Sequence, residues 1–246
     1  MRRVLGPVLF FSAIAAVWEF GVAWFDVPRY LLPPLSRVAS AAWETRDEIV
    51  SNAVVTAGEV LGGFLLATFV GVGLGALIHA SALARRTLYP LVTAFNGMPK
   101  IALAPLLVVW FGYGFTSKVV ASFVFAAFPI VVATVGGLAA TPLVLDEHFR
   151  ALGATTWDTF WRLRLPAALP SITDGLKIGM PLAVIGATVG EFVGAERGLG
   201  YLILFATTQA RIDLVFAGIM AVTLLSVAFS WIVDRASRAV WWRANS

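Results

Sequence analysis

The sequence has no cysteine and few charged residues. Its 246 residues include two His, and Asp, Glu, Lys and Arg together make up 13%, against roughly 25% in soluble domains. Without thiols, the chain forms no disulfide, cysteine-ligated zinc site or iron–sulfur cluster. A hydrophobic content of 59% excludes disorder and is too high for a single soluble domain. The composition therefore predicts an integral membrane protein.

Sequence motifs of common enzymes are also missing. There is no G-x-x-x-x-G-K-[ST] loop to hold ATP phosphates, no H-E-x-x-H metal motif and no G-x-S-x-G nucleophile turn. The two histidines, His79 and His148, lie far apart in the sequence. We therefore expect a chain that is not an enzyme, with no catalytic residue, metal site or cofactor of its own.

Six apolar stretches are long enough to cross a membrane, for which a helix needs about 20 residues. They predict an all-α integral membrane protein with six transmembrane helices in one domain, residues 1–246. We interpret the first stretch as a retained anchor, because no small-residue cleavage site follows it. The expected spans are Leu5–Phe25, Thr56–Ala80, Leu88–Gly112, Val119–Leu145, Ser171–Val193 and Leu214–Val233.

The basic residues indicate how the chain is oriented. If the N-terminus is cytoplasmic, 11 of the 18 Lys and Arg residues lie inside and six, including Lys118, lie outside. This bias predicts that both termini are cytoplasmic. The expected outer loop Asp26–Val55 combines Pro33-Pro34 with a polar stretch, Trp43–Asn52, and we expect this loop to hold a short surface helix. The segment Asp146–Pro170 is then the only sizeable cytoplasmic one.

Besides Asp174 and Lys177 near the start of the fifth span, four charged residues fall inside or near the ends of these spans: Glu19, Glu59, Lys100 and Glu191. Each costs roughly 2.5–3.5 kcal/mol at the bilayer centre, so it needs a partner, water or a function. Irregular backbone at that depth is tolerated where it lines a cavity, which makes the Pro99-Lys100 break a candidate pore element. The four residues would also suit a stand-alone secondary transporter or channel, although no inverted repeat is evident.

Small residues recur at four-residue spacing in two of the expected spans. Gly71 and Gly75 do so in the second span, and Gly186, Gly190 and Gly194 do so in the fifth. Such rows let helix backbones approach closely. They predict ordinary packing inside the membrane, or else a seam between two copies or a moving wall of the pore.

The cytoplasmic segment contains a distinctive pattern. We expect a helix interrupted at Gly153, where the chain bends cheaply, and a second helix that ends at Pro166. Trp157, Phe160 and Trp161 are spaced to share one helix face. The segment would serve either as an interfacial anchor or as a docking element for a cytoplasmic partner.

This segment resembles the cytoplasmic loop of the permeases of binding-protein-dependent ABC importers. That loop has a Glu followed by two alanines, a glycine six residues after the Glu, and a Leu-Pro pair. Glu147, Gly153 and Leu165-Pro166 match it, while His148 and Phe149 replace the alanines. A narrower resemblance to the nitrate/sulfonate/taurine permease subfamily rests on residues 31–34, 98–106, 110–112 and 198–203 and on Glu191.

The resemblance implies a type I importer permease fold, similar to that of the methionine permease MetI. It also implies a second permease copy, most simply a homodimer, two ATP-binding subunits that hold ATP and Mg, and an extracytoplasmic substrate-binding protein, with no role for nucleic acid. The location would be the bacterial inner membrane. The cargo would be a small solute, by preference an anion such as a sulfonate, taurine or nitrate. The resemblance also leaves bicarbonate and pyrimidine- or flavin-type vitamins open.

The resemblance and the pattern together give three sets of candidate residues. The ATPase-coupling set is Asp146, Glu147, Arg150, Ala151, Leu152, Gly153, Ala154, Trp157, Phe160, Leu165 and Pro166. The pathway or gate set is Met98, Pro99, Lys100, Pro105, Gly190 and Glu191. The binding-protein contact set is Gly194, Gly198, Leu199, Gly200 and Tyr201.

Overall fold

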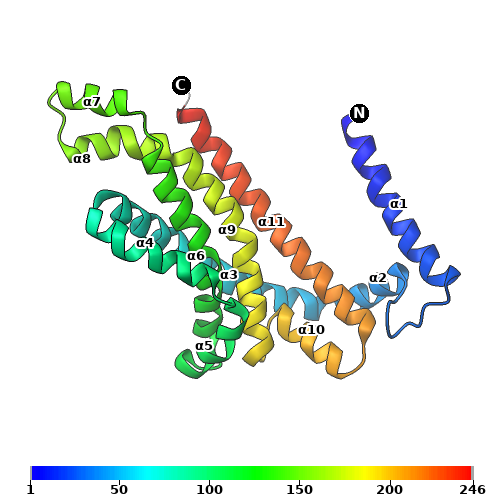
Figure 1. Ribbon diagram of the computed structural model, residues 1–246. Coiled ribbons are helices and arrows are strands. Elements are labelled where there is room, and N and C mark those ends of the chain that lie inside the picture. Colours follow the sequence, from blue (N-terminus) through cyan, green and yellow to red (C-terminus); the bar gives the residue numbers. More distant parts are fainter. Residues whose placement is uncertain (1, 245–246) are drawn as a thin grey trace. The chain divides into compact units, whose positions relative to one another are not determined.

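The computed structural model describes the backbone of residues 2–244 and the side chains of residues 6 and 8–238. All regular structure in that part of the chain is helical, which confirms the all-α prediction (Figure 1). In chain order the elements are α1 (Arg2–Trp24), α2 (Leu35–Glu44), α3 (Arg46–Ala80), α4 (Ala82–Gly97), η1 (Lys100–Leu103), α5 (Ala104–Phe111), α6 (Phe115–Ala139), α7 (Leu143–Ala151), α8 (Thr156–Thr159), η2 (Phe160–Arg164), α9 (Leu165–Gly194), α10 (Leu199–Thr208) and α11 (Ile212–Ala244). The chain divides into two compact units, Met1–Val55 with Glu196–Leu224, and Thr56–Ala195 with Leu225–Ser246.

In the described part of the chain, four helical runs are long and apolar enough to cross a membrane. They are Arg46–Ala80, Phe115–Ala139, Thr156–Gly194 and Ile212–Arg238. The bent pair α4 and η1–α5 makes a fifth if it is counted as one span. Within the described side chains, the apolar part of α1, Val8–Trp24, is shorter than a span. The structure thus supports four or five of the six predicted spans, and the extreme termini, predicted to be cytoplasmic, lie outside the described residues.

The third expected span is broken at Pro99, whereas Pro90 lies inside α4 and does not end it. Helix α4 ends at Gly97, and the next helical pair begins at Lys100 with a bend of 93° between them. Met98 has extended backbone (φ −73°, ψ 140°), as expected for a residue before proline. Pro99 has no N–H to continue the helix. Instead of one straight span, the segment forms two arms of a broken span or re-entrant loop.

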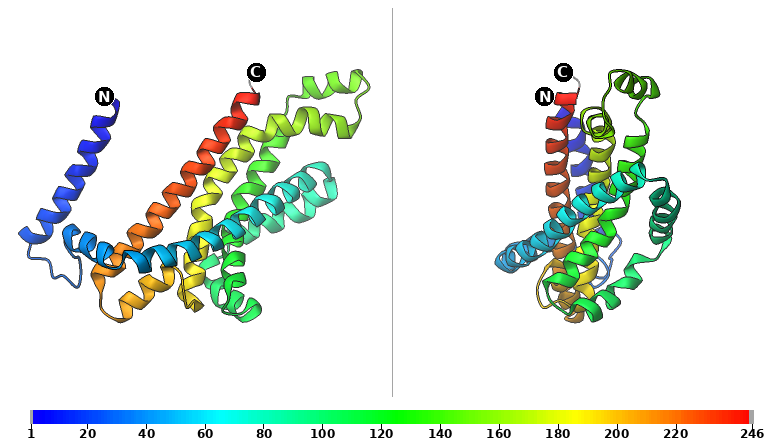
Figure 2. Two further views of the ribbon diagram at one scale, coloured as in Figure 1. Left: turned by 180° about the vertical axis from the view of Figure 1, so that it is seen from behind. Right: turned by 90° about the vertical axis from the view of Figure 1, so that its left-hand side faces the viewer.

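The second unit is built around α6, which packs on both α3 and α9. Figures 1 and 2 show α6 and α9 side by side. A Cβ added at Gly71 of α3 would lie 2.8 Å from Ile130 of α6, and one at Gly186 of α9 would lie 2.7 Å from the Ala121 carbonyl oxygen of α6. The glycine rows therefore permit close helix packing within the chain.

The expected outer loop Asp26–Val55 contains one short helix before α3 begins. Helix α2 covers Leu35–Glu44 and buries Val38 and Ala41, whereas the polar residues after Thr45 form the first turns of α3. Asp47 and Glu48 lie in the first turn of α3, where acidic side chains favour the positive end of the helix dipole. The prediction of a short helix within this loop is therefore confirmed, although the polar stretch Trp43–Asn52 is divided between the end of α2 and the start of α3.

Glu19, a charged residue in the first expected span, has a hydrogen-bonding partner in Ser36. Within the first unit, its carboxylate accepts hydrogen bonds from the Ser36 backbone N–H at 3.0 Å and from the Ser36 hydroxyl at 2.7 Å. It therefore satisfies an N–H in the first turn of α2 that has no partner within the helix. Trp18, one residue earlier, donates its indole N–H to the Pro33 carbonyl oxygen at 3.0 Å.

Candidate functional site

The predicted coupling segment forms two short helices joined by a tight turn, the α7–α8 loop. Gly153 lies in the turn with φ +77°, a conformation that favours glycine. Its N–H donates to the Arg150 carbonyl oxygen at 3.0 Å. Thr155 then caps α8 in a reciprocal capping box with Asp158. The interruption predicted at Gly153 is confirmed.

The second helix of this loop does not end at Pro166. Helix α8 continues through the π-helical turn η2 into α9, so that Thr156–Gly194 is one run of 39 residues. The expectation that Pro166 stops the helix was therefore wrong. Pro166 lies in the first turn of α9, directly after η2, and a break in regular α-helical bonding at this point accommodates a residue without an N–H. The loop is thus continuous with a candidate membrane span.

The three aromatic residues of this segment do not form one exposed face. Trp157 and Trp161 are 69% and 49% exposed, with ring centroids 5.5 Å apart. Phe160 packs instead against the buried cluster of Leu138, Ala168 and Ile172. The wider turn of η2 changes the angular spacing on which the prediction relied.

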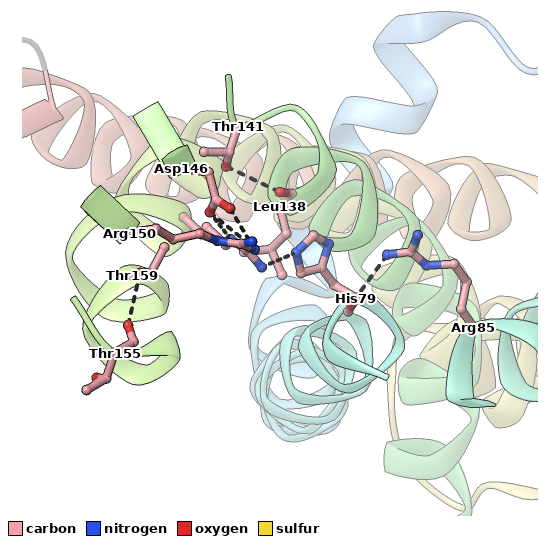
Figure 3. Close-up of polar contacts among 9 residues, drawn as sticks. His79, Arg85, Leu138, Thr141, Asp146, Arg150, Thr155 and Thr159 are labelled. Carbon is pink, nitrogen blue, oxygen red and sulfur yellow. Dashed lines mark hydrogen bonds and ion pairs between the residues drawn. The ribbon is translucent and has the colours of Figure 1, made fainter. Parts of the chain in front are cut away.

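A polar network lies at the base of the loop (Figure 3). Asp146 of α7, only 8% exposed, accepts hydrogen bonds on Oδ1 from Nε and Nη2 of Arg164 at 3.0 and 2.8 Å. Its Oδ2 lies 3.1 Å from Nη2 of Arg150. Nη1 of Arg164 lies 3.2 Å from Nε2 of His79. The Arg164 guanidinium thus connects α7, the η2 turn and the end of α3.

The network gives residues of the coupling set different environments. The hydrogen bond from Arg164 is the main cause that lowers the pKa of Asp146, and its charge and that of Arg150 add to the effect. Asp146 is therefore an anion held inside the chain, whereas Glu147 and Ala151 are exposed. Sequence reasoning missed His79, because nothing in the pattern relates it to a residue 85 positions later.

A cavity of about 580 Å³ lies beside the broken span, lined by α3, α4, η1, α5 and α6. Its wall is mostly apolar and includes the aromatic rings of Phe95, Trp110 and Phe128. Lys100 also lines it, with Nζ 3.2 Å from Oδ1 of Asn96 and 5.7 Å from the Phe128 ring centroid. The cavity therefore combines aromatic surface with one cation and one amide.

The predicted pathway residues divide between two places. Met98 and Lys100 line the cavity, and Pro99 and Pro105 shape the backbone around it as the N-cap of η1 and in the first turn of α5. Gly190 instead packs on α6, where an added Cβ would lie 3.3 Å from that of Ala121.

Glu191 belongs to a buried polar cluster that contains Thr56, Glu59, Lys118 and Glu191 itself. Glu191 is 1% exposed and accepts a hydrogen bond from the Thr56 hydroxyl at 2.6 Å. Glu59 is hydrogen-bonded to Glu191 and lies near Lys118. Lys118, counted above as a loop residue, is buried in the first turn of α6 and donates to the carbonyl oxygens of Tyr113 and Gly194.

The predicted binding-protein contacts show mixed exposure. Gly198 has φ +117° and precedes α10, and its N–H donates to Oδ1 of Asn52 at 2.7 Å. Leu199 is fully buried, whereas Tyr201 is half-buried and stacks on Phe205. Gly194 ends α9 and Gly200 lies in the first turn of α10. Leu199 therefore supports this turn from inside.

Comparison with known proteins identifies the class of this chain. Residues 67–242 match the family of binding-protein-dependent transport system inner membrane components. The chain is 38% identical over 226 residues to the formylaminopyrimidine transport permease protein ThiX of Halalkalibacterium halodurans, covering 92% of this chain and 90% of the relative. It is 26% identical to the taurine transport system permease protein TauC of Escherichia coli, covering 81% and 72%.

The chain therefore belongs to the binding-protein-dependent transport system inner membrane component family, and it is an ABC importer permease component. The fold agrees with a solved structure of the MetNI methionine ABC transporter in an inward-facing conformation. A chain of that structure superposes with a TM-score of 0.71 at 24% identity, covering 80% of this chain and 98% of its own length. The prediction of a MetI-like permease fold is confirmed.

Proposed function

We propose that two copies of this chain form the membrane pathway of an ABC importer, driven by ATPase subunits that dock on the loop 147–166. The structure of the α7–α8 loop is the main observation that supports this proposal. It presents exposed side chains such as Glu147, Trp157 and Trp161, and it is continuous through η2 with α9. A force applied to the loop therefore reaches a membrane-spanning helix directly.

ATP hydrolysis is assigned to the partner subunits, which hold ATP and Mg, and this chain contributes no catalytic residue. An extracytoplasmic binding protein delivers the solute to the opposite face. We assign its contact to the segment 194–201 and to the loop 26–55. At the first of these surfaces, Glu196 and Arg197 are exposed and suited to polar contacts. In this scheme both termini are cytoplasmic.

We further propose that the cargo is a small anionic solute, such as a sulfonate, taurine or nitrate. Lys100 supports this choice, because it brings a cation to the wall of a mostly apolar cavity. A planar heterocyclic solute is the second candidate, favoured by the rings of Phe95, Trp110 and Phe128 around the same cavity and by the similarity to ThiX. Aromatic rings stack favourably on planar ligands.

The two cargo classes predict different effects on uptake when residues of the cavity wall are replaced. For an anion, replacing Lys100 with Gln removes a charge-assisted contact worth about 1.5–3 kcal/mol, so uptake falls roughly ten-fold or more. Trp110→Leu then has a smaller effect. For a planar heterocycle, Trp110→Leu causes the larger loss. To distinguish the two cargo classes, uptake of taurine and of a pyrimidine is measured in vesicles that contain each variant.

Co-purification tests the proposed function itself. Tagged permease extracted from its native membrane should retain an ATP-hydrolysing subunit, and the complex in liposomes should accumulate solute only with ATP and the binding protein. The alternative, a secondary transporter or channel that uses Glu19, Glu59, Lys100 and Glu191, predicts ion-driven uptake by the chain alone. Uptake by the isolated chain under an ion gradient would overturn the proposal.

A further inference from the structure

Arg164 contacts residues both inside the coupling loop and outside it. Two of its nitrogens bind Asp146 within the loop, but Nη1 reaches outside the loop to Nε2 of His79 at 3.2 Å. His79 is the penultimate residue of α3. Its carbonyl oxygen accepts a hydrogen bond from Nη2 of Arg85, in α4, at 3.2 Å. The contacts therefore form a chain of bonds from α7 through Arg164 to the junction of α3 and α4.

The geometry defines the hydrogen-bonding role of each group. A guanidinium only donates, so Nε2 of His79 is the acceptor and its hydrogen lies on Nδ1. Nδ1 is buried and has no partner in the described part of the chain, so Nε2 is the atom through which the ring is held. A side chain with an acceptor at the same place can replace histidine here, whereas an apolar side chain cannot.

The π-helical turn places Arg164 at this junction. Arg164 is the last residue of η2, immediately before α9. Because a π turn contains an additional residue, it rotates the side chains that follow relative to a regular α-helix. Arg162, two residues earlier, is 76% exposed on its side chain, and its ion pair in the described part of the chain is with Asp158, at 3.6 Å. The two arginines of one turn thus have different surroundings.

The two helices that meet next to His79, α3 and α4, also form part of the cavity wall. Leu74 of α3, five residues before His79, lines the cavity, and so do Leu91 and Phe95 of α4. A displacement of the end of α3 therefore displaces two walls of the cavity.

We infer that Arg164 is a positioning residue that joins the ATPase-docking loop to the α3–α4 junction, so that movement of the loop is transmitted to the cavity wall. The inference rests on the proposed function, because the loop must be the docking site. It assigns to His79 and Arg164 a role in transmission instead of a role in contacting the ATPase or the solute. In this account, α7, η2 and the end of α3 move as one body during the ATP cycle.

Spin-label distances test this inference, because the chain has no cysteine of its own. Cysteines replace His148 on α7 and Leu83 at the start of α4, both exposed, and nitroxides are attached to them in the purified complex with its ATPase. The distance between the two labels of one copy is measured without nucleotide and with ATP and vanadate. The background variants are Arg164→Gln, His79→Leu, His79→Gln and Arg162→Gln.

The inference predicts one distance, unchanged between the two states, in the unmodified background. Arg164→Gln and His79→Leu should broaden the distribution at least two-fold and make it depend on ATP and vanadate. His79→Gln, which keeps an acceptor, and Arg162→Gln, the matched control, should behave as the unmodified chain. His79→Leu leaves the Asp146–Arg164 pair intact, so it decides the question if Arg164→Gln fails to assemble.

Two results overturn the inference alone: a His79→Leu distribution identical to the unmodified one in both states, or equal broadening by Arg162→Gln and Arg164→Gln. Absence of an ATPase from the purified unmodified complex is a different failure. It overturns the proposed function together with the role inferred here for Arg164.

Discussion

Thr56 and Glu191 are joined by a hydrogen bond of 2.6 Å across 135 residues of sequence. His79 and Arg164 join the same two helical runs a second time, near their opposite ends. Thr56 and His79 are separated by about 35 Å of α3, at 1.5 Å per residue. Helix α3 and the run from η2 through α9 are thus antiparallel and connected at two distant points, with α6 packed against both. This arrangement suits two helices that must move together.

The first prediction concerns the Thr56–Glu191 bond. Thr56→Val removes a donor to a buried carboxylate, so we expect the free energy of unfolding to fall by about 1–3 kcal/mol. Thr68→Val is the matched control, because the Thr68 hydroxyl donates to the Phe64 carbonyl oxygen of its own helix, at 2.8 Å. Thermal unfolding in detergent measures both. Equal stability of the two variants would show that the Thr56 contact contributes nothing.

The second prediction concerns the contact between α6 and α9. A Cβ at Gly186 would lie 2.7 Å from a backbone oxygen, so Gly186→Ala forces the helices apart and should cost about 1–3 kcal/mol. At Gly73, where nothing lies within 4 Å of an added Cβ, the same substitution should be neutral or slightly stabilising. The melting temperatures of the two variants measure this difference in stability. A Gly186→Ala variant as stable as Gly73→Ala would contradict the close packing.

The third prediction concerns the turn at Gly153. Proline cannot adopt the φ of +77° found there, and it also loses the N–H that binds the Arg150 carbonyl oxygen. We expect Gly153→Pro to uncouple ATP hydrolysis from uptake, and Glu147→Lys to do the same by reversing an exposed charge. Gly153→Asn should retain most activity, since Asn tolerates this conformation.

The ratio of solute transported to ATP hydrolysed measures these effects. Substrate-stimulated hydrolysis and uptake at the unmodified level in both Gly153→Pro and Glu147→Lys would contradict the role assigned to the loop.

The fourth prediction concerns pH. Because the pKa of Asp146 is lowered in the folded chain, its ion pair stabilises the loop above the unfolded value of about 3.9 and is lost as pH falls through the folded value. A spin label on Leu152, which is 73% exposed, should keep the same mobility from pH 8 to pH 5. Asp146→Asn should raise that mobility at all of these pH values. A rise between pH 7 and pH 5 in the unmodified background would assign the transition to another group.

The features that the sequence predicted well are governed by local backbone chemistry. The breaks at Pro99 and Gly153 follow from a missing N–H and from a positive φ, which act on the residue itself and its neighbours. The long spans follow from apolar length alone. These signals need no knowledge of what packs against them.

The features that the sequence did not predict depend on distant partners. The continuation of the helix past Pro166 requires the π turn at Phe160–Arg164, for which no residue pattern gives a local signal. Glu191 was assigned to the pathway with Lys100, but only packing reveals its hydrogen bond to Thr56. The same holds for the contact between Arg164 and His79, 85 residues apart.

Photo-crosslinking tests most directly the central claim that the α7–α8 loop receives the ATPase. A single cysteine at Ala151, an exposed residue of the loop, is labelled with a photoreactive maleimide in the purified complex, and Leu204 on α10 serves as the exposed control. Illumination should crosslink the chain to the ATP-hydrolysing subunit from position 151 and not from position 204. An ATPase that co-purifies but crosslinks equally from both positions, or only from 204, would contradict the account.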